Sequence, residues 1–589
     1  MNSDLNLEAK RHSLAHLLAA AVLELYPDTR NTLGPAVENG FYYDFDFLTP
    51  ISDKDLNKIE NKMREISKSW NGFSHKEAIQ EEADILFEDN PYKLELIKEI
   101  VSRGEKITLY TSGDFTDLCR GGHVEDFSEI AKDSWRLSHI AGAYWRGDEK
   151  NKMLTRIYGL AFNSGDDLVA YEKRMVEAKE RDHRKLGKEL DLFTFSDLVG
   201  SGLPLFTPRG QAMRESITDF LWSLSKKYGY QKVQIPHIAK LELYETSGHA
   251  EKFRDEFFYV DGAQSGQKFV MKPMNCPHHT QIFAAKPRSY KNLPLRFTEL
   301  TMQYRDEKPG ELLGLSRVRS ITIDDAHIFC KPEDIKIEVT NIVKIIEEFY
   351  QALGMWNKGK TFWVSLSVRD PKTPEKYLGD SDNWDKAERY LQEVSVELGL
   401  DAKRMEGEAA FYGPKLDFMF TDALGRERQL ATAQVDFVQP QRFGLEYTAS
   451  SGERATPVMI HRAVAGSLER FMAILIEHFA GNFPLWLSPT QVKIVPVRDS
   501  HDAHARELFN MFVGSGIRAE IDESDVNLGK KIRAAKVEKA PYWIVVGDKE
   551  MESGKYILES SSGKKMEPLG GDAISDLLLK QISDKSLLE

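Results

Sequence analysis

A strongly charged stretch at residues 166–190 divides this 589-residue chain into segments with different sequence patterns. Acidic and basic side chains dominate the stretch, which is typical of a solvated helical connector. At roughly 150 residues per domain, a chain of this length is expected to hold about four folding units. We therefore predict an N-terminal domain over 1–165, a helical linker over 166–190, a central domain over 191–485 and a C-terminal domain over 486–589.

The segments on either side of the linker predict different folds. Leucine and alanine recur at helical spacing over 8–25, which predicts an amphipathic helix that Pro27 ends, and residues 106–111 predict a strand. Beyond Asp191, strand-like pieces alternate with longer helices, which favours a mostly antiparallel sheet with flanking helices. Short apolar strands separated by helices after residue 492 predict an α/β unit. The expected fold class is therefore α+β and multidomain.

The composition excludes several classes of protein. Hydrophobic residues make up 41% of the chain, so large cores can form and a wholly disordered chain is excluded. The net charge of −13 excludes a globally basic nucleic-acid binder, although a local basic surface remains possible. Three cysteines exclude a disulfide scaffold, and neither a membrane span nor a signal peptide is recognisable. We expect a cytoplasmic enzyme with no membrane partner.

Three residues far apart in the central segment could bind a metal ion. Cys276, His327 and His461 offer one thiolate and two imidazoles, which is a ligand set that suits zinc. Three protein ligands leave a fourth position for a substrate, as in catalytic rather than structural zinc sites. Because the chain has 15 histidines, spacing alone also allows three ordinary core or surface residues.

A second set of central residues is rich in arginine. Arg305 precedes a polar turn, Arg317 and Arg319 follow it, and Arg470 belongs to a later helix. Guanidinium groups near both ends of such a hairpin could clamp a polyphosphate. The alternative is a solvated hairpin with routine salt bridges. No Gly-x-x-x-x-Gly-Lys-Ser/Thr sequence occurs, so a P-loop ATPase is not expected.

A third set lies near the N-terminus. His12 and His16 are four residues apart on one helical face, and Cys119 and His123 add a thiol and another imidazole. By residue type alone, the four groups are compatible with a closed zinc site. Surface histidines and a metal-free hydrolytic pocket remain as alternatives.

Together these motifs resemble the threonyl-tRNA synthetases, a family of class II aminoacyl-tRNA synthetases. The resemblance covers nearly the whole chain in the family's order. It implies an α/β editing domain at the N-terminus, a class II antiparallel-sheet catalytic domain and a C-terminal α/β anticodon-binding domain. The small ubiquitin-like module that commonly begins the family is expected to be absent. The matching segments are 203–210, 246–249, 271–277, 317–319, 324–329, 411–418 and 461–471.

The resemblance implies that the chain activates L-threonine with ATP and Mg²⁺ and transfers it to tRNA(Thr), as a homodimer with Pro236 in the first class II motif. It implies Zn²⁺ ligation by Cys276, His327 and His461. A threonine pocket that requires the side-chain hydroxyl group would reject valine, which lacks it, by ~10⁴-fold or more. The remaining implied roles are ATP binding by Arg305, Glu307, Arg317 and Arg470, proton abstraction from the terminal ribose by His249, and binding of threonine or adenylate by Met274, Asp325, Tyr412, Gln429, Gln434 and Ser467.

Serine retains the hydroxyl group and lacks only the methyl group of threonine. Because one methyl group contributes only roughly 1–3 kcal/mol to discrimination between the two amino acids, a second, hydrolytic site is required to remove serine. The resemblance assigns that site to the N-terminal domain and associates it with water-mediated hydrolysis of seryl-tRNA(Thr). The implied editing residues are His12, His16, Lys93, Asp117, Cys119 and His123.

The chain departs from the family pattern at two places. Ile323 stands where the family usually has glutamine, which removes one polar contact from the active site or leaves it to other residues. In the C-terminal domain, Ser524–Asn527 replaces a more polar and basic segment, and Ser560–Ser562 replaces a basic patch. Phosphate contacts there are expected mainly from the basic segment 530–539.

Two other functions remain open at the level of sequence. One is a tRNA-binding paralogue that has lost aminoacylation, which Ile323 and the altered C-terminal segments would favour. The other is a synthetase-like ligase that acts on a small molecule without tRNA. The predicted editing domain argues against the second, because ester editing requires a charged tRNA.

Overall fold

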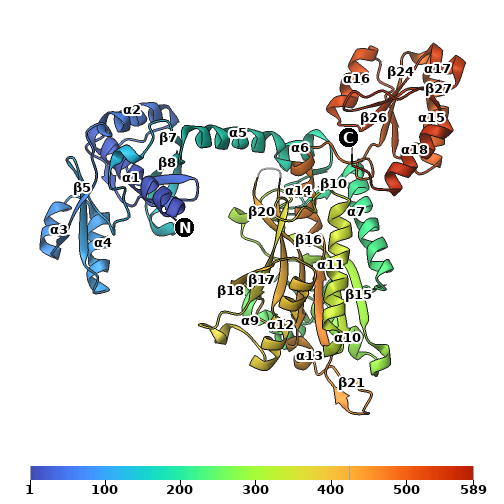
Figure 1. Ribbon diagram of the computed structural model, residues 1–589, viewed down its shortest axis with the longest axis horizontal. Coiled ribbons are helices and arrows are strands. Elements are labelled where there is room, and N and C mark those ends of the chain that lie inside the picture. The colour runs from blue at the N-terminus through green and yellow to red at the C-terminus, as the bar shows by residue number, and fades with distance from the viewer. Residues whose placement is uncertain (1, 423–424, 588–589) are drawn as a thin grey trace. The chain divides into compact units, whose positions relative to one another are not determined.

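The computed structural model describes residues 2–422 and 425–587. The chain forms two compact units, Met1–Val176 and Glu177–Glu589 (Figure 1). In the described part, no helix is both long enough and apolar enough to cross a membrane. The bounds of the four segments expected from the sequence stay predictions.

The first unit is built around its N-terminal helix, α1 (Asn2–Leu25). The helix was expected to be amphipathic, and this was wrong, because every residue from Ser13 to Val22 is buried. A helix with apolar side chains on all faces is enclosed by its neighbours. These are α2 (Leu56–Ile66) and a sheet of β1 (Arg30–Asn31), β2 (Ala36–Val37), β3 (Gly40–Asp46), β8 (Met153–Ala161) and β7 (Trp135–Tyr144).

A smaller sheet completes this unit. It contains β4 (Ser74–Ala78), β5 (Ile107–Ser112) and β6 (Phe115–Leu118), so the strand predicted at 106–111 is confirmed. The helices α3 (Gln80–Leu86) and α4 (Pro91–Ser102) join its first two strands. The side chain of Asn90 accepts hydrogen bonds from the first amides of α4, which fixes the start of that helix and places Lys93 in its first turn.

The predicted linker is helical, but only its first half is solvated. α5 (Gly165–Arg181) buries Leu168 alone, whereas α6 (His183–Glu189) buries His183, Leu186 and Gly187. Leu186 belongs to the large apolar core of the second unit. The charge pattern concealed this docking because few of the α6 side chains are apolar.

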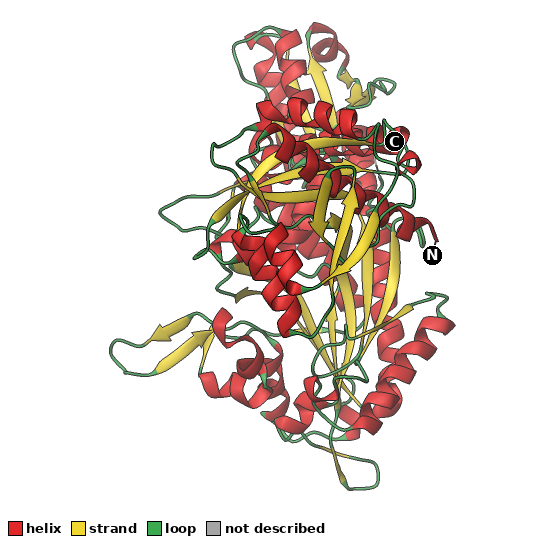
Figure 2. Cartoon of the chain, turned by 90° about the vertical axis from the view of Figure 1, so that its left-hand side faces the viewer, coloured by secondary structure: helices red, strands yellow, loops and turns green. Residues whose placement is uncertain are grey.

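The second unit contains the mostly antiparallel sheet that the sequence predicts. In the described residues its strand order is β11-β15-β16-β23-β20-β19-β17-β18, with parallel pairs only at the two edges. Figure 2 shows its long strands running side by side. The strands are β11 (Gln231–Lys232), β15 (Leu295–Tyr304), β16 (Ser320–Cys330), β23 (Val458–Ala463), β20 (Glu427–Asp436), β19 (Lys415–Thr421), β17 (Phe362–Val368) and β18 (Lys403–Glu406).

Alternation along these strands separates the core from the site. Ala326 and Ile328 of β16 belong to the core, whereas Asp325 and His327 lie on the opposite face. Core helices are α7 (Pro208–Lys227), α11 (Ile335–Gln351), α12 (Ser381–Glu397) and α14 (Leu468–Phe479). Smaller elements are α8 (Leu241–Ser247), α9 (His249–Phe253), α10 (Cys276–Ala284), α13 (Val438–Arg442), β9 (Phe193–Thr194), β10 (Leu205–Phe206), β12 (Ile238–Ala239), β13 (Tyr259–Asp261), β14 (Lys268–Met271), β21 (Tyr447–Thr448) and β22 (Arg454–Ala455).

A buried ion pair ties two central strands together. Arg462 Nη2 donates to Asp324 Oδ1 at 2.9 Å. Asp324 Oδ2 accepts from the backbone amides of Val464 and Ala465. Removing one partner of such a pair leaves an uncompensated buried charge.

We expect Asp324→Ala to lower the free energy of unfolding by about 3–5 kcal/mol, because Arg462 would remain buried without its carboxylate. Chemical denaturation of the full chain measures this change. Glu393→Ala removes a partly exposed partner of Lys336 and should cost less than about 1 kcal/mol. Equal losses from the two substitutions would contradict the prediction.

The C-terminal part is the α/β unit expected from the sequence. Its sheet has the order β25-β24-β26-β28, with β28 antiparallel to the parallel strands. The elements are β24 (Val492–Pro496), α15 (Asp502–Gly514), β25 (Ala519–Ile521), α16 (Leu528–Val537), β26 (Tyr542–Val546), α17 (Asp548–Ser553), β27 (Lys555–Tyr556), β28 (Leu558–Ser560), β29 (Leu569–Gly570) and α18 (Gly571–Ser583).

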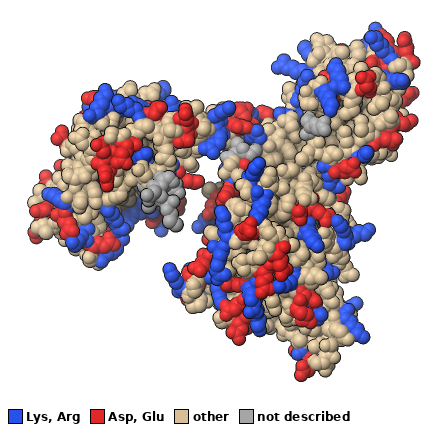
Figure 3. All heavy atoms as spheres, in the orientation of Figure 1, with Lys and Arg blue, Asp and Glu red and all other residues tan. Residues whose placement is uncertain are grey.

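The basic segment 530–539 is less uniform than the sequence indicates. Lys530, Arg533 and Lys536 are exposed, but Lys531 is buried and donates to the carbonyl of Pro496 at 3.2 Å. The phosphate-facing set is therefore smaller than expected. On the face shown in Figure 3, Lys and Arg side chains are interspersed with Asp and Glu side chains.

Candidate functional site

The predicted metal ligands converge on the polar face of the central sheet. Cys276 is the first residue of α10, and His327 and His461 lie opposite each other in the β16–β23 register. One ligand atom from each of the three lies within 4.8 Å of the others, and all three residues are buried. Residues separated by 185 positions therefore form one candidate metal centre.

Each candidate ligand is held by a neighbour that the sequence analysis did not identify. His279 Nδ1 is 2.7 Å from His327 Nδ1, and Asp436 Oδ2 is 2.9 Å from His461 Nε2. Gln439 Nε2 donates to Cys276 Sγ at 3.5 Å. Partners of this kind orient metal-binding imidazoles and fix their tautomers. Of these three neighbours, only His279 could have been found from the sequence, because it lies in the same segment as Cys276. No sequence pattern pointed to Asp436 or Gln439.

Burial shifts the pKa values of two of these residues. Burial raises the pKa of the Cys276 thiol well above its usual value. Burial, followed by the charges of His279 and His461, keeps the pKa of His327 well below that of a free imidazole. One thiol and two imidazoles with fixed outer partners form a donor set suited to Zn²⁺.

The predicted amino-acid pocket adjoins these ligands. Asp325 Oδ1 is 3.5 Å from His327 Nε2, and Asn275 Nδ2 donates to Asp325 Oδ2 at 3.0 Å. Tyr412 donates its hydroxyl to Gln434 Oε1 at 2.8 Å. Carboxylate, amide and hydroxyl groups therefore line one side of the candidate metal centre.

His249 lies beside the candidate metal centre. It is buried, with Nε2 at 3.9 Å from Cys276 Sγ and Nδ1 at 2.8 Å from the hydroxyl of Ser247. Burial, followed by the charges of His461, Arg305 and Arg442, lowers the pKa of His249 to about 3. The imidazole is therefore unprotonated at neutral pH.

Two predicted pocket residues are engaged in local structure. Gln429 Nε2 donates to Asp417 Oδ1 at 2.7 Å, and Asp417 also binds Thr432, a residue that the sequence did not highlight. The hydroxyl of Ser467 accepts from the amide of Arg470 and begins α14. Ile323 forms a backbone bridge with Ser467, so the departure from the family pattern lies at this end of the pocket.

The predicted ATP-binding arginines gather at the end of the same face. Arg317 forms ion pairs with Glu307 and Glu311, each at 2.7 Å. Arg305 Nη2 is 3.5 Å from Met274 Sδ.

Burial lowers the pKa of Arg470, and the next largest causes are the charges of Arg428, Arg317 and Arg305. Mutually repelling cations suit a polyphosphate, and Arg428 is the member that the sequence analysis missed.

Five of the six predicted editing residues, His12, His16, Lys93, Asp117 and Cys119, line a cavity of about 400 Å³ in the first unit, and the sixth, His123, contacts Cys119. Cys119 Sγ is 3.2 Å from His123 Nε2 and 3.5 Å from His12 Nε2. Gly121 and Gly122 have φ values of +93° and +86°, which turn the chain so that His123 returns to the thiol. The possible metal-ligand atoms of His12, His16, Cys119 and His123 also lie within 4.8 Å of one another.

A buried ion pair forms another wall of this cavity. Lys93 Nζ lies 2.5 Å from Asp117 Oδ1, and both residues are almost fully buried. Tyr43 donates its hydroxyl to Asp117 and accepts from Lys93 at 3.2 Å. Tyr43 was not predicted as a site residue.

The editing histidines are neutral in this environment. Burial, followed by the charges of His16 and His12, lowers the pKa of His123 to about 2. Burial also lowers the pKa of His12, and that of His16 falls well below its usual value. Burial raises the pKa of the Cys119 thiol to about 11.

Comparisons with known proteins agree with this architecture. Three family models match: "Threonyl and Alanyl tRNA synthetase second additional domain" over residues 107–158, "tRNA synthetase class II core domain (G, H, P, S and T)" over 258–479, and "Anticodon binding domain" over 491–581. These matches confirm the expected α+β fold class with its three kinds of domain.

Curated relatives match over most of the chain. The threonine–tRNA ligase of Cytophaga hutchinsonii is 48% identical over 96% of this chain and 87% of its own length. That of Gloeobacter violaceus is 50% identical over 92% of this chain and 87% of its own. A solved threonyl-tRNA synthetase structure from Cryptosporidium parvum Iowa II is 34% identical, with a TM-score of 0.63 over 69% of this chain and 98% of that one.

The polar face of the class II sheet, the separate histidine-lined cavity and the extent of these similarities lead to one assignment. The chain belongs to the threonine–tRNA ligase family.

Proposed function

We propose that the chain activates L-threonine with ATP and transfers it to tRNA(Thr), and that it hydrolyses mischarged seryl-tRNA(Thr). The observation that carries the proposal is the convergence of Cys276, His327 and His461 beside Asp325. Close to them lies the arginine cluster, which consists of Arg305, Arg317, Arg428 and Arg470. This arrangement supports a hydroxyl-selective pocket next to a polyphosphate site.

In the activation step, the carboxylate of threonine attacks the α-phosphate of ATP, and pyrophosphate leaves. Arg305, Arg317 and Arg470, together with Mg²⁺ bound to ATP, stabilise the negative charge on the reacting phosphates. Met274, Tyr412, Gln429, Gln434 and Ser467 line or support the pocket, and Glu307 would contact adenine from its position beside Arg317. His249 would accept the ribose proton during transfer, since its imidazole is neutral.

Cys276, His327 and His461 would hold Zn²⁺ in this pocket. When bound, the ion would supply Lewis-acid coordination to the amino and hydroxyl groups of threonine. Asp325 accepts the hydroxyl proton or a hydrogen bond from it, and this demand for a hydroxyl group excludes valine.

The editing reaction belongs to the cavity of the first unit. Water attacks the ester carbonyl carbon of seryl-tRNA(Thr), the bond from that carbon to the ribose oxygen breaks, and serine leaves. An unprotonated imidazole of the His12, His16 and His123 set takes the proton of the water and returns it to the ribose oxygen. Lys93 and Asp117 hold the polar wall, and Cys119 fixes the positions of His12 and His123.

We further propose that the chain acts in the cytoplasm as a homodimer. Pro236 matches the first class II motif, and the nearby β15 exposes the apolar side chains of Leu300 and Met302. Such side chains on a strand near the sheet edge favour association with a second copy.

Pyrophosphate exchange followed by aminoacylation tests the proposal. Threonine-dependent exchange and transfer to tRNA(Thr) are both expected. A paralogue that has lost aminoacylation, the reading that Ile323 favours, would show neither reaction. A ligase that acts without tRNA would show exchange alone.

The editing rate should depend little on pH between 5.5 and 7.5. An imidazole with a pKa of 6.5 would lose about 10-fold of its neutral form over this range. The pKa values of His12, His16 and His123 are lowered, so protonation begins at a lower pH and the base remains available. Deacylation of seryl-tRNA(Thr), corrected for uncatalysed hydrolysis, measures this. A tenfold fall with a midpoint near 6.5 would show that the base is an ordinary exposed histidine.

A further inference from the structure

A tight turn at residues 313–317 carries part of the proposed ATP site. The amide of Leu313 donates to the carbonyl of Arg317 at 3.2 Å, and the amide of Arg317 donates back to the carbonyl of Leu313 at 3.3 Å. The carbonyl of Ser316 in the same turn accepts from Arg470 Nε at 3.1 Å. The position of this turn therefore sets the positions of both Arg317 and Arg470.

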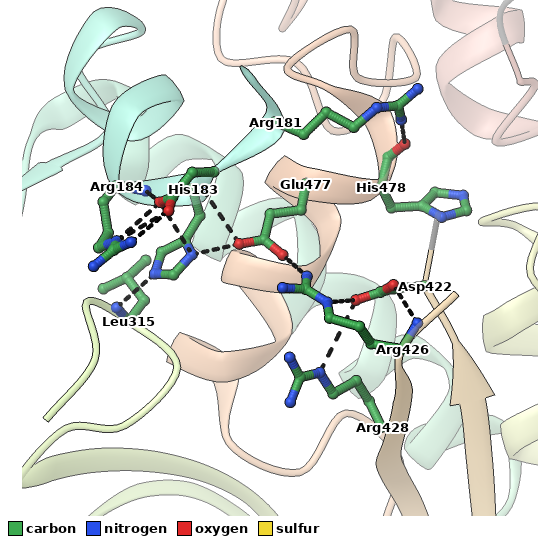
Figure 4. A network of polar contacts seen from close by, with 10 residues as sticks. Arg181, His183, Arg184, Leu315, Asp422, Arg426, Arg428, Glu477 and His478 are labelled. Atoms are coloured by element: carbon green, nitrogen blue, oxygen red, sulfur yellow. Dashed lines mark hydrogen bonds and ion pairs between the residues drawn. The ribbon is translucent and has the colours of Figure 1, made fainter. Parts of the chain in front are cut away.

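The turn rests on His183, the first residue of α6. The amide of Leu315 donates to His183 Nε2 at 3.1 Å, and Leu315 is fully buried (Figure 4). Gly314 has a φ of +49°, and a Cβ atom at that position would lie 2.3 Å from His183 Nε2. The backbone of the turn thus packs directly against the imidazole, without an intervening side chain.

Glu477 of α14 fixes the orientation of this imidazole. His183 Nδ1 lies 2.7 Å from Glu477 Oε1, and the backbone amide of His183 donates to the same oxygen at 3.3 Å. Because Nδ1 donates to the carboxylate, Nε2 is the unprotonated nitrogen that accepts from Leu315. With both ring nitrogens occupied, the group Asp182, His183 and Glu477 leaves no imidazole lone pair for a metal ion, although its ligand atoms lie within 4.8 Å.

The same carboxylate connects back to the arginine cluster. Glu477 Oε2 pairs with Arg426, whose Nε donates to Asp422 Oδ2 at 2.7 Å. Arg428 Nε lies 4.0 Å from that oxygen. Figure 4 shows these side chains as one network between α6, α14 and the start of β20.

We propose that His183 is a positioning residue for ATP: its Nε2 holds the amide of Leu315 and thereby places Arg317 and, through Ser316, Arg470. The inference rests on the proposed assignment of these two arginines to the phosphates of ATP. The predicted linker therefore contributes directly to the geometry of the activation site.

Two substitutions of His183 test the roles of its two ring nitrogens separately. In His183→Gln, the side-chain amide reaches the position of Nε2 and can still accept from Leu315. In His183→Asn, the amide reaches only the position of Nδ1 and can bind Glu477 alone. We expect His183→Asn to raise the KM for ATP in pyrophosphate exchange by about 10-fold, and His183→Gln to stay within about 3-fold of the unchanged protein.

The KM for threonine should remain within about 2-fold in both variants, because the groups proposed to bind threonine at the candidate metal centre, Cys276, Asp325, His327 and His461, belong to α10, β16 and β23 rather than to the turn. Lys185→Ala, on an exposed side chain of α6, is the matched control and should change neither KM. Gly314→Ala is a second route to the same defect, since its Cβ displaces the turn from the imidazole, and it should also raise the KM for ATP.

Equal effects of the asparagine and glutamine variants would overturn the inference, as would a parallel rise in both KM values. If His183→Asn does not fold, an unchanged KM for ATP in Gly314→Ala overturns it. Failure of the underlying ATP site is distinguishable: Arg317→Ala and Arg470→Ala would then leave the KM for ATP unchanged.

Discussion

Replacing Cys276 with alanine will lower threonine-dependent pyrophosphate exchange by ~10³-fold or more, because the pocket loses the thiolate of its metal-binding set. Cys276 is buried beside His327 and His461, and Gln439 is the neighbour that supports its sulfur. Exchange kinetics and elemental analysis of the purified protein should show loss of activity together with loss of one zinc per chain.

Cys330→Ala is the matched control for this substitution. Cys330 is also a fully buried thiol of the second unit, but it packs in the apolar core at the end of β16. Its removal should leave the KM for threonine unchanged. A metal-free protein that selects threonine over valine normally would refute the assignment of the metal-binding residues.

The double substitution His12→Ala and His123→Ala should abolish editing and leave activation intact. We expect the rate of seryl-tRNA(Thr) hydrolysis to fall by ~10²–10⁴-fold, which is the usual contribution of a general base. Pyrophosphate exchange should be unaffected, because the editing cavity and the central sheet belong to different compact units. Accumulation of seryl-tRNA(Thr) in an aminoacylation assay with serine provides the measurement.

The matched control removes two exposed histidines of the same unit, His75 and His139. That variant should clear seryl-tRNA(Thr) at the normal rate. Normal clearance by the His12 and His123 variant would instead mean that another group activates the water.

Local patterns along the chain predicted several of the elements correctly. The strand near 106–111 and the alternation of α and β after residue 492 are present in the structure. Errors occurred where burial depends on distant neighbours. The periodicity of α1 could not reveal that all its faces are covered, and the charges of α6 concealed His183 and Leu186.

The sequence by itself determined the chemical groups: the thiol and imidazoles for a metal, the arginines for phosphates, and the two histidines four residues apart on α1. Their order along the chain was sufficient to indicate the family. Only the tertiary structure decided which groups support them, because His279, Asp436 and His183 act through contacts across strands and helices. Such contacts depend on strand register and helix docking, and these are set by packing of the whole unit rather than by spacing along the chain.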